Sequence, residues 1–191
     1  MPRKPCPRKN ATWVSTRAIY EIDVRDFDRA RSDLDRAIQN ADRPYLRFLR
    51  GLVSCQMGEP ARSLADFDAA IAGQPENSQF YRGRSLARSV VGNPEGALAD
   101  AEQLVTLSPQ VATSYYARGI ALARLGRDWE ALWDFDEALG RQPELVYPLF
   151  ARADAFERLG RYDQSVADRE AAMRRQMEQS GCAACPDPFR Y

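Results

Sequence analysis

Histidine is absent from the 191 residues of this chain. Its absence removes the side chain that proteins use most often as a general base and as a metal ligand. The sequence also contains no glycine-rich phosphate-binding loop and no motif that places a nucleophile beside a base. We therefore expect a protein that is not an enzyme and that binds no metal and no other cofactor.

Cysteine is scarce: the chain has four, which at this length is too few for a disulfide framework. Cys182 and Cys185 form a CxxC pair in the tail 180–191, but no second pair lies nearby to complete a tetrahedral zinc site. Pro186 follows the pair, where a haem-attachment motif would have histidine. We interpret the pair as coincidental or as labile thiols. A zinc ion or a disulfide shared with another chain is the alternative.

Long apolar runs are missing as well, because no stretch approaches the roughly 20 apolar residues that a membrane-spanning helix needs. The basic, proline-rich tail 1–10 has no apolar segment behind it, unlike a secretory signal. We expect no insertion into a membrane and, by default, a cytoplasmic protein. An organellar or processed form is the alternative.

Neither sign of charge dominates, since 27 Lys and Arg residues balance 27 Asp and Glu residues. The tail 1–10 carries four of the cations and no acid, so the remainder of the chain is mildly acidic. A protein that binds nucleic acid needs a basic stripe. We therefore expect no nucleic-acid partner.

What the sequence does have is a period of 34 residues. The stretch from Gly51 to Pro75 resembles the stretch from Gly119 to Pro143, which lies two periods further on. Prolines, glycines and small residues each recur on the same step: Pro75, Pro109 and Pro143; Gly58, Gly92, Gly126 and Gly160; Ser63, Ala97, Ala131 and Ser165.

This pattern resembles the tetratricopeptide repeat family, whose period is 34 residues. The unit 112–145 fits the family pattern best, through Tyr115, Gly119, Gly126, Ala131, Phe135, Ala138 and Pro143. The resemblance covers residues 11–179 and implies an all-α fold, a right-handed α-solenoid of about five helix-turn-helix repeats. The expected units are 11–43, 44–77, 78–111, 112–145 and 146–179, and repeat positions are counted from the first residue of each.

The two terminal units depart from the pattern. Glu21 and Arg25 replace the aromatic residue and the glycine of the first unit. In the last unit Arg169 replaces an aromatic residue and Met177 replaces the proline. Terminal repeats have only one neighbour, so such departures are expected of them.

Two rows of opposite charge run through all five units. Position 7 is always arginine and position 23 is always aspartate: Arg17, Arg50, Arg84, Arg118 and Arg152; Asp33, Asp66, Asp100, Asp134 and Asp168. An acid recurs at position 25: Asp35, Asp68, Glu102, Asp136 and Glu170. The planar guanidinium suits a carboxylate, so we predict a structural ladder of ion pairs. A track for phosphate or for an acidic peptide is the alternative.

In the tetratricopeptide family the first helices line a concave groove, chiefly through positions 2, 5, 9 and 12. The resemblance therefore implies a partner-binding groove lined by Tyr45, Phe48, Leu52, Arg82, Leu86, Tyr116, Ile120, Tyr147 and Phe150. Members that bind the C-terminal carboxylate of heat-shock chaperones have Lys, Asn and Arg there, so that function is not implied. Aromatic and aliphatic residues suit an extended or helical peptide with apolar anchors. The alternative is that some of these rings belong to the core between repeats.

Trp129 and Trp133 occupy positions 18 and 22, where the other units have Asp, Ala, Glu or Ser. They lie four residues apart, on one face of a helix. We predict an exposed apolar patch on the convex side that is a candidate interface. The alternative is that both rings pack into a neighbouring turn or under the C-terminal tail.

These features favour a non-catalytic protein-interaction module, a scaffold, adaptor or assembly factor that binds a protein or peptide segment in its groove. The alternative is a structural subunit embedded in a larger multiprotein complex through its convex tryptophan face and its tails.

Overall fold

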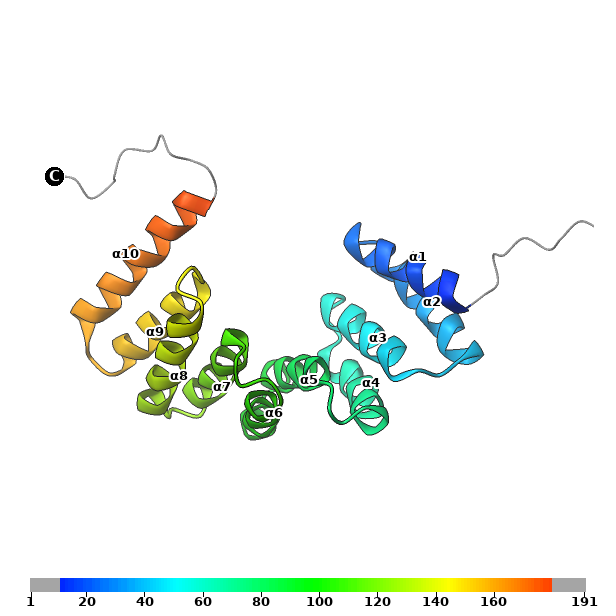
Figure 1. Cartoon of the computed structure of the whole chain (residues 1–191), viewed down its shortest axis with the longest axis horizontal. Coiled ribbons are helices and arrows are strands. Elements are labelled where there is room, and N and C mark those ends of the chain that lie inside the picture. The colour runs from blue at the N-terminus through cyan, green and yellow to red at the C-terminus, as the bar shows by residue number, and fades with distance from the viewer. Residues whose placement is uncertain (1–10, 180–191) are drawn as a thin grey trace, which may run out of the picture. The chain divides into compact units, whose positions relative to one another are not determined.

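The computed structural model describes residues 11–179 of the chain, with side chains from residue 16 onward. Over this range it contains ten α-helices and no strand, arranged as successive pairs (Figure 1). The first helices of the pairs are α1 (Ala11–Asp23), α3 (Pro44–Gln56), α5 (Ser78–Val90), α7 (Ala112–Arg124) and α9 (Tyr147–Arg158). The second helices are α2 (Phe27–Asn40), α4 (Pro60–Gly73), α6 (Pro94–Leu107), α8 (Asp128–Arg141) and α10 (Tyr162–Gln179). The expected all-α repeat fold is confirmed.

The helices form two compact units, α1–α6 up to Leu107 and α7–α10 from Ser108. In both units the two helices of a pair pack against each other. In the first unit α3 also packs on α2, and α5 on α4; in the second unit α9 packs on α8. Helices α3, α5 and α9 therefore each bury one face within their own pair and another against the preceding second helix, as in other repeat proteins.

A left-handed residue ends the first helix of each pair. Gly58, Gly92, Gly126 and Gly160 have φ between 73° and 79°. In the first pair Arg25 adopts φ 62°, and the N–H of Asp26 donates to the carbonyl of Glu21 at 2.8 Å, just as Glu59 donates to Ser54 at 2.9 Å. The turn is thus retained although a side chain makes this conformation unfavourable by roughly 1–2 kcal/mol.

Prolines set the length of the second helices. Pro75, Pro109 and Pro143 each lie two residues beyond the end of α4, α6 or α8. A proline disfavours helical backbone at the residue before it, so the helix stops. Met177 stands at this position in the last repeat, and α10 continues past it to Gln179 with 18 residues.

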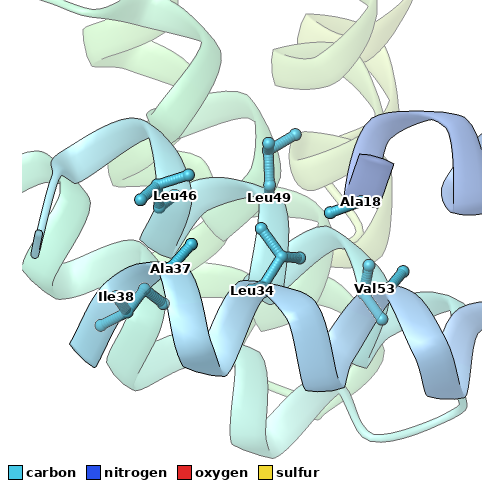
Figure 2. Close-up of a cluster of buried hydrophobic side chains, with 8 residues drawn as sticks. Ala18, Leu34, Ala37, Ile38, Leu46, Leu49 and Val53 are labelled. Atoms are coloured by element: carbon cyan, nitrogen blue, oxygen red, sulfur yellow. The ribbon is translucent and has the colours of Figure 1, made fainter. Parts of the chain in front are cut away.

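The apolar core of the first unit begins where α2 packs between α1 and α3. Figure 2 shows Leu34 and Ala37 of α2 facing the side chains of α3, with Ala18 of α1 alongside. The cluster comprises Ala18, Ala30, Leu34, Ala37, Ile38, Leu46, Leu49 and Val53. Burying these side chains in two directions links neighbouring pairs through the hydrophobic effect.

Glycines of the first helices make room for phenylalanines of the second helices. A Cβ on Gly51 would lie 2.7 Å from the ring of Phe67, and one on Gly119 would lie 2.6 Å from the ring of Phe135. Both rings are fully buried. The close approach of the two helices in these pairs therefore requires glycine on one side and a flat ring on the other.

Candidate protein-interaction site

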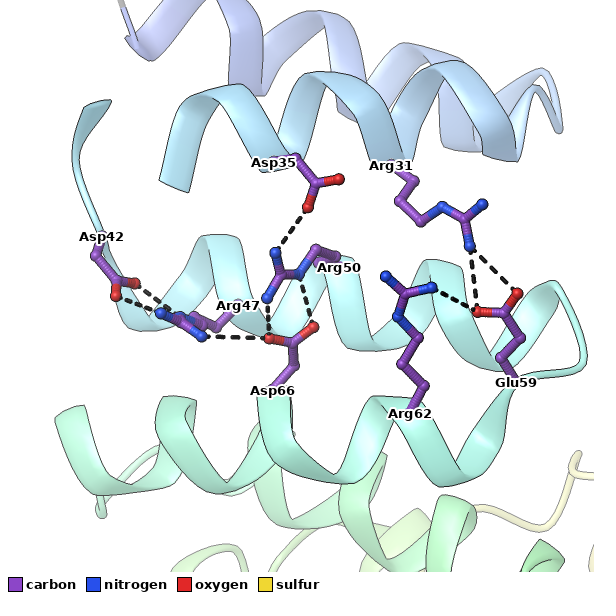
Figure 3. A network of polar contacts seen from close by, with 8 residues as sticks. All are labelled: Arg31, Asp35, Asp42, Arg47, Arg50, Glu59, Arg62 and Asp66. Atoms are coloured by element: carbon purple, nitrogen blue, oxygen red, sulfur yellow. Dashed lines mark hydrogen bonds and ion pairs between the residues drawn. The ribbon is translucent and has the colours of Figure 1, made fainter. Parts of the chain in front are cut away.

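Every arginine at position 7 is paired with the aspartate 16 residues further on. Arg50 donates to Asp66 from Nε at 2.8 Å and from Nη2 at 2.6 Å (Figure 3). The equivalent pairs are Arg17 with Asp33, Arg84 with Asp100, Arg118 with Asp134 and Arg152 with Asp168. Two parallel N–H···O bonds to one carboxylate make each of these a strong, directional ion pair.

The acids at position 25 extend the ladder from one pair of helices to the next. The Nη1 atom of Arg50 donates to Asp35 of the preceding pair at 2.7 Å, which Figure 3 shows between α2 and α3. Arg84 with Asp68, at 2.7 Å, and Arg152 with Asp136, at 2.5 Å, repeat the contact. Both edges of these guanidinium groups therefore bond to carboxylates of the chain itself.

Burial shapes the acid–base behaviour of the ladder. The Asp134 side chain is fully buried, and burial raises its pKa although the hydrogen bonds from Arg118 act in the opposite direction. The hydrogen bonds to Asp66 raise the pKa of Arg50 above its ordinary value. The Arg50 guanidinium therefore stays charged, and the Asp134 carboxylate depends on Arg118 to remain ionised away from water.

The groove residues of the first unit are not equally accessible. Tyr45 and Leu86 are exposed, as is Arg82, and Leu52 is half-buried. Phe48 is different, because only 7% of it is exposed.

The repeat pattern predicts that Phe48 is accessible. The structure corrects this prediction, because it places the Phe48 ring in the core. Its centroid lies 5.0 Å from that of Phe80 and 6.0 Å from that of Phe67. A Cβ on Gly83 of α5 would lie 3.2 Å from the Phe48 ring. The absent side chain of Gly83 thus leaves the space into which Phe48 turns.

In the second unit the groove positions bring two tyrosines together. The rings of Tyr116 on α7 and Tyr147 on α9 meet edge to face with centroids 4.6 Å apart and planes at 63°. Tyr147 is exposed, whereas Tyr116 is half-buried against Phe135, and burial raises the pKa of Tyr116. Ile120 and Phe150, on the same two helices, are half-buried. The exposed ring is therefore fixed in place by a more buried one.

Trp129 and Trp133 on α8 are 58% and 56% exposed. Each nevertheless has one supported side. The Arg161 guanidinium lies 4.6 Å from the Trp129 ring centroid, so this ring contacts the turn of the following pair. Trp133 meets Tyr115 edge-on at 6.3 Å, with Arg118 at 5.8 Å from the Trp133 ring. The two rings form an exposed patch held by cation–π and aromatic contacts.

Val90 is an accessible apolar residue that the groove positions do not include. It lies four residues after Leu86 on α5, and both are exposed, so an aliphatic strip continues along one face of this helix. The signal in the sequence is the contrast with the equivalent residues, which are Asp23, Gln56, Arg124 and Arg158.

The other side chains considered for chemistry are the cysteines and possible clusters of metal ligands. The Cys55 thiol is half-buried and lies 3.2 Å from the Ser63 hydroxyl, and burial raises its pKa. Cys182 and Cys185 lie outside the described residues. Within residues 11–179 no three His, Cys, Asp or Glu side chains gather as metal ligands, and no helix is both long and apolar enough to span a membrane.

Paired helices on a 34-residue step, joined by left-handed turns and by ion pairs between neighbouring pairs, define a helical-repeat protein. The model of the tetratricopeptide repeat family matches residues 16–77 and 86–146, which is more than half of the chain. The chain therefore belongs to the tetratricopeptide repeat family. Proteins of this family generally mediate protein–protein interactions. No curated protein sequence matches the chain.

Solved structures share the fold at low sequence identity. MamA from Desulfovibrio magneticus is 15% identical, with 88% of this chain and 96% of that chain covered and a TM-score of 0.78. A thermophilic TPR protein from Thermus thermophilus, TTC0263, is 18% identical, with coverage of 90% and 94% and a TM-score of 0.75. YrrB, described as a TPR protein with an unusual peptide-binding site, is 16% identical, with coverage of 91% and 90% and a TM-score of 0.70.

Proposed function

We propose that this chain is a non-catalytic protein-interaction module, a scaffold, adaptor or assembly factor that binds a protein or peptide segment along its first helices. The observation that carries the proposal is the pair formed by Tyr116 and Tyr147. An exposed ring that is already fixed by a neighbour loses little conformational freedom when a partner covers it. Such rigid aromatic side chains are the usual anchors of binding sites.

The first unit offers a complementary surface on α3 and α5. Tyr45, Leu52 and Leu86 provide accessible apolar area. Among the described residues Arg82 donates a hydrogen bond to Gln79, at 2.5 Å, and forms no ion pair with a carboxylate. This combination suits a segment whose apolar side chains fill the surface while an acidic side chain reaches Arg82.

The charges of the chain support a protein or peptide as the partner rather than a nucleic acid. Most ladder arginines are engaged by two carboxylates each, so the row leaves little positive potential for a phosphate backbone. The same pairing, together with the absence of histidine, supports a role without catalysis. By default we place this role in the cytoplasm.

Peptides selected from a random display library on the immobilised chain would test the proposal. Affinities of a selected peptide for the parent, Tyr147→Ala and Trp133→Ala would be measured by calorimetry, with circular dichroism to check folding. We expect Tyr147→Ala to weaken binding by about 2 kcal/mol, roughly 30-fold, as for a central aromatic anchor. Trp133→Ala should bind like the parent. Unchanged binding of the peptide to Tyr147→Ala would exclude the proposed site.

The exposed Trp129 and Trp133 favour a second candidate function, that of a subunit embedded in a larger complex through the convex tryptophan face. Under this alternative the purified chain should be poorly soluble without its neighbours, and Trp133→Ala should abolish incorporation while Tyr147→Ala has no effect. Size-exclusion chromatography of the isolated chain distinguishes the two functions, since a free adaptor should elute as a soluble species.

A further inference from the structure

Helix α1 exposes a face whose equivalent is buried in the first helices α3, α5 and α9. Tyr20 occupies repeat position 10 and is 64% exposed, and Val24, one turn further on, is also exposed. At position 10 the helices α3, α5 and α9 carry Val53, Ala87 and Ala155, which are fully buried. These three helices pack on α2, α4 and α8. Among the described residues no preceding second helix covers the face of α1 that, in α3, α5 and α9, packs on one.

Helix α10 exposes the opposite kind of face. At repeat position 21, Leu132 of α8 is buried, and Leu64 of α4 packs against the core cluster that includes residues of α5. The equivalent residue of α10, Val166, is 54% exposed. Met177, further along α10, is also exposed. Helix α10 therefore presents the kind of surface on which, in other repeats, a following first helix packs.

The ion-pair ladder has matching ends. Acids at position 25 bond to the arginine of the following repeat in the pairs Asp35 with Arg50, Asp68 with Arg84 and Asp136 with Arg152. Glu170 is the next acid on this row, and it has no bonding partner among the described residues. Arg17 heads the row of arginines. One end of the described array thus carries an acid, and the other an arginine, of the kind that join successive repeats.

We propose that copies of this chain associate head to tail, with α1 of one copy packing on α10 of the next. Glu170 then meets Arg17 of the next copy, which continues the contact seen between Asp136 and Arg152. A second copy of the chain is the partner that fits these faces, because the same kind of helix packing already joins successive helix pairs within the chain.

The large side chains at the two ends suit each other. Positions 24 and 10 of successive repeats share a core cluster, as Leu34 does with Val53 and Phe67 with Ala87. The end faces have Arg169 at position 24 and Tyr20 at position 10. Arg169 donates to Asp154 at 2.9 Å, and in the proposed contact its planar guanidinium stacks on the incoming Tyr20 ring.

Because the two faces differ, the association is heterologous, and it produces rings or open chains rather than a symmetric dimer. Sedimentation velocity of the full chain over a range of concentrations measures this directly. We expect the average mass to rise above the 21.6 kDa of one chain as concentration increases. Tyr20→Arg, which sets a like charge against Arg169, blocks the head, and the double variant Val166→Asp/Glu170→Arg blocks the tail. Each should raise the apparent Kd by about tenfold or more, because buried or like charges oppose association.

Mixing the two variants gives the decisive measurement. At a concentration above the parent Kd and below the raised Kd, each variant alone should remain mainly at the mass of one chain. The mixture should form a one-to-one dimer and nothing larger, since one intact head and one intact tail remain. Formation of that dimer also shows that both variants are folded. Trp133→Ala, which lies on neither end face, should associate like the parent.

Three results would overturn head-to-tail association. The first is a parent chain that remains a monomer up to about 1 mM, where even weak specific association is populated. The second is self-association of the tail-blocked variant alone, which indicates a symmetric contact through α1. The third is self-association of the head-blocked variant alone, which indicates a symmetric contact through α10.

Discussion

Replacing Arg118 with alanine tests whether the arginine row is structural. Asp134 is fully buried and accepts hydrogen bonds from Arg118 at 2.7 and 2.9 Å. In Arg118→Ala both bonds disappear, while the carboxylate stays away from water. Breaking a buried ion pair by removing one partner costs about 3–5 kcal/mol, and hydrogen bonds to charged groups contribute about 1.5–3 kcal/mol each. We expect Arg118→Ala to lower the free energy of unfolding by about 3 kcal/mol at neutral pH.

The loss should depend on pH in a specific direction. Burial already raises the pKa of Asp134, and removal of Arg118 raises it further. A carboxyl group with a folded pKa above its unfolded value binds more protons when folded, so its contribution to stability falls as pH rises through that interval. The stability of Arg118→Ala should therefore approach that of the parent toward acid pH and fall behind it toward neutral pH.

Urea unfolding followed by circular dichroism at several pH values measures both effects. Arg84→Ala is the matched control, because its partner Asp100 keeps an ion pair with Arg88 at 2.9 Å. The control should lose about 1–2 kcal/mol, less than Arg118→Ala. If Arg118→Ala unfolds at the same urea concentration as the parent but no longer binds a selected peptide, the row is a ligand track and the structural interpretation is wrong.

Three further variants probe the local packing and turns. Arg25→Gly should stabilise the chain by roughly 0.5 kcal/mol in urea unfolding, because relief of the strain at φ 62° exceeds the conformational entropy that glycine loses on folding. A loss of stability would show that the contacts of the arginine side chain contribute more than the turn conformation. Glu21→Gln should stabilise it by about 1 kcal/mol at neutral pH, since burial raises the pKa of Glu21 and its Oε2 atom has no hydrogen-bond partner among the described residues. That gain should shrink in urea titrations toward about pH 4, where the raised folded pKa makes the parent more stable, and a pH-independent gain would contradict it. Gly119→Ala should cost about 1–3 kcal/mol in the same unfolding assay, because the new Cβ meets the Phe135 ring, and Phe135→Leu in the same chain should recover part of the loss.

The fold follows from the sequence because its period is set by residues with strong local effects. Pro75 and Gly58 act on the backbone next to them, so the helix ends they impose recur wherever they recur. The turn at Arg25 could not be read in the same way. There the neighbouring helices α1 and α2 hold a conformation that the residue itself disfavours.

The candidate site is less predictable, because accessibility depends on residues of other helices. Phe48 and Tyr116 share repeat position 5, yet Phe48 is buried in the core and Tyr116 is half-buried beneath an exposed ring. The difference for Phe48 arises from Gly83, 35 residues away in the sequence, whose missing side chain opens the space that the ring fills. A prediction based on position within one repeat takes no account of residues in other repeats, so it misses such a space.

The ladder also determines what is left for recognition. Arg50, Arg84 and Arg152 each bond to two carboxylates, so these strong charges join helices within the chain. Exposed ion pairs contribute little to affinity in any case, because water and salt screen them. Under the proposed function, specificity comes mainly from shape and apolar contact, and Arg82 is the cation that orients the partner segment. Under the proposed function, Tyr147 supplies the main apolar contact, because its ring is exposed and packs edge to face against Tyr116.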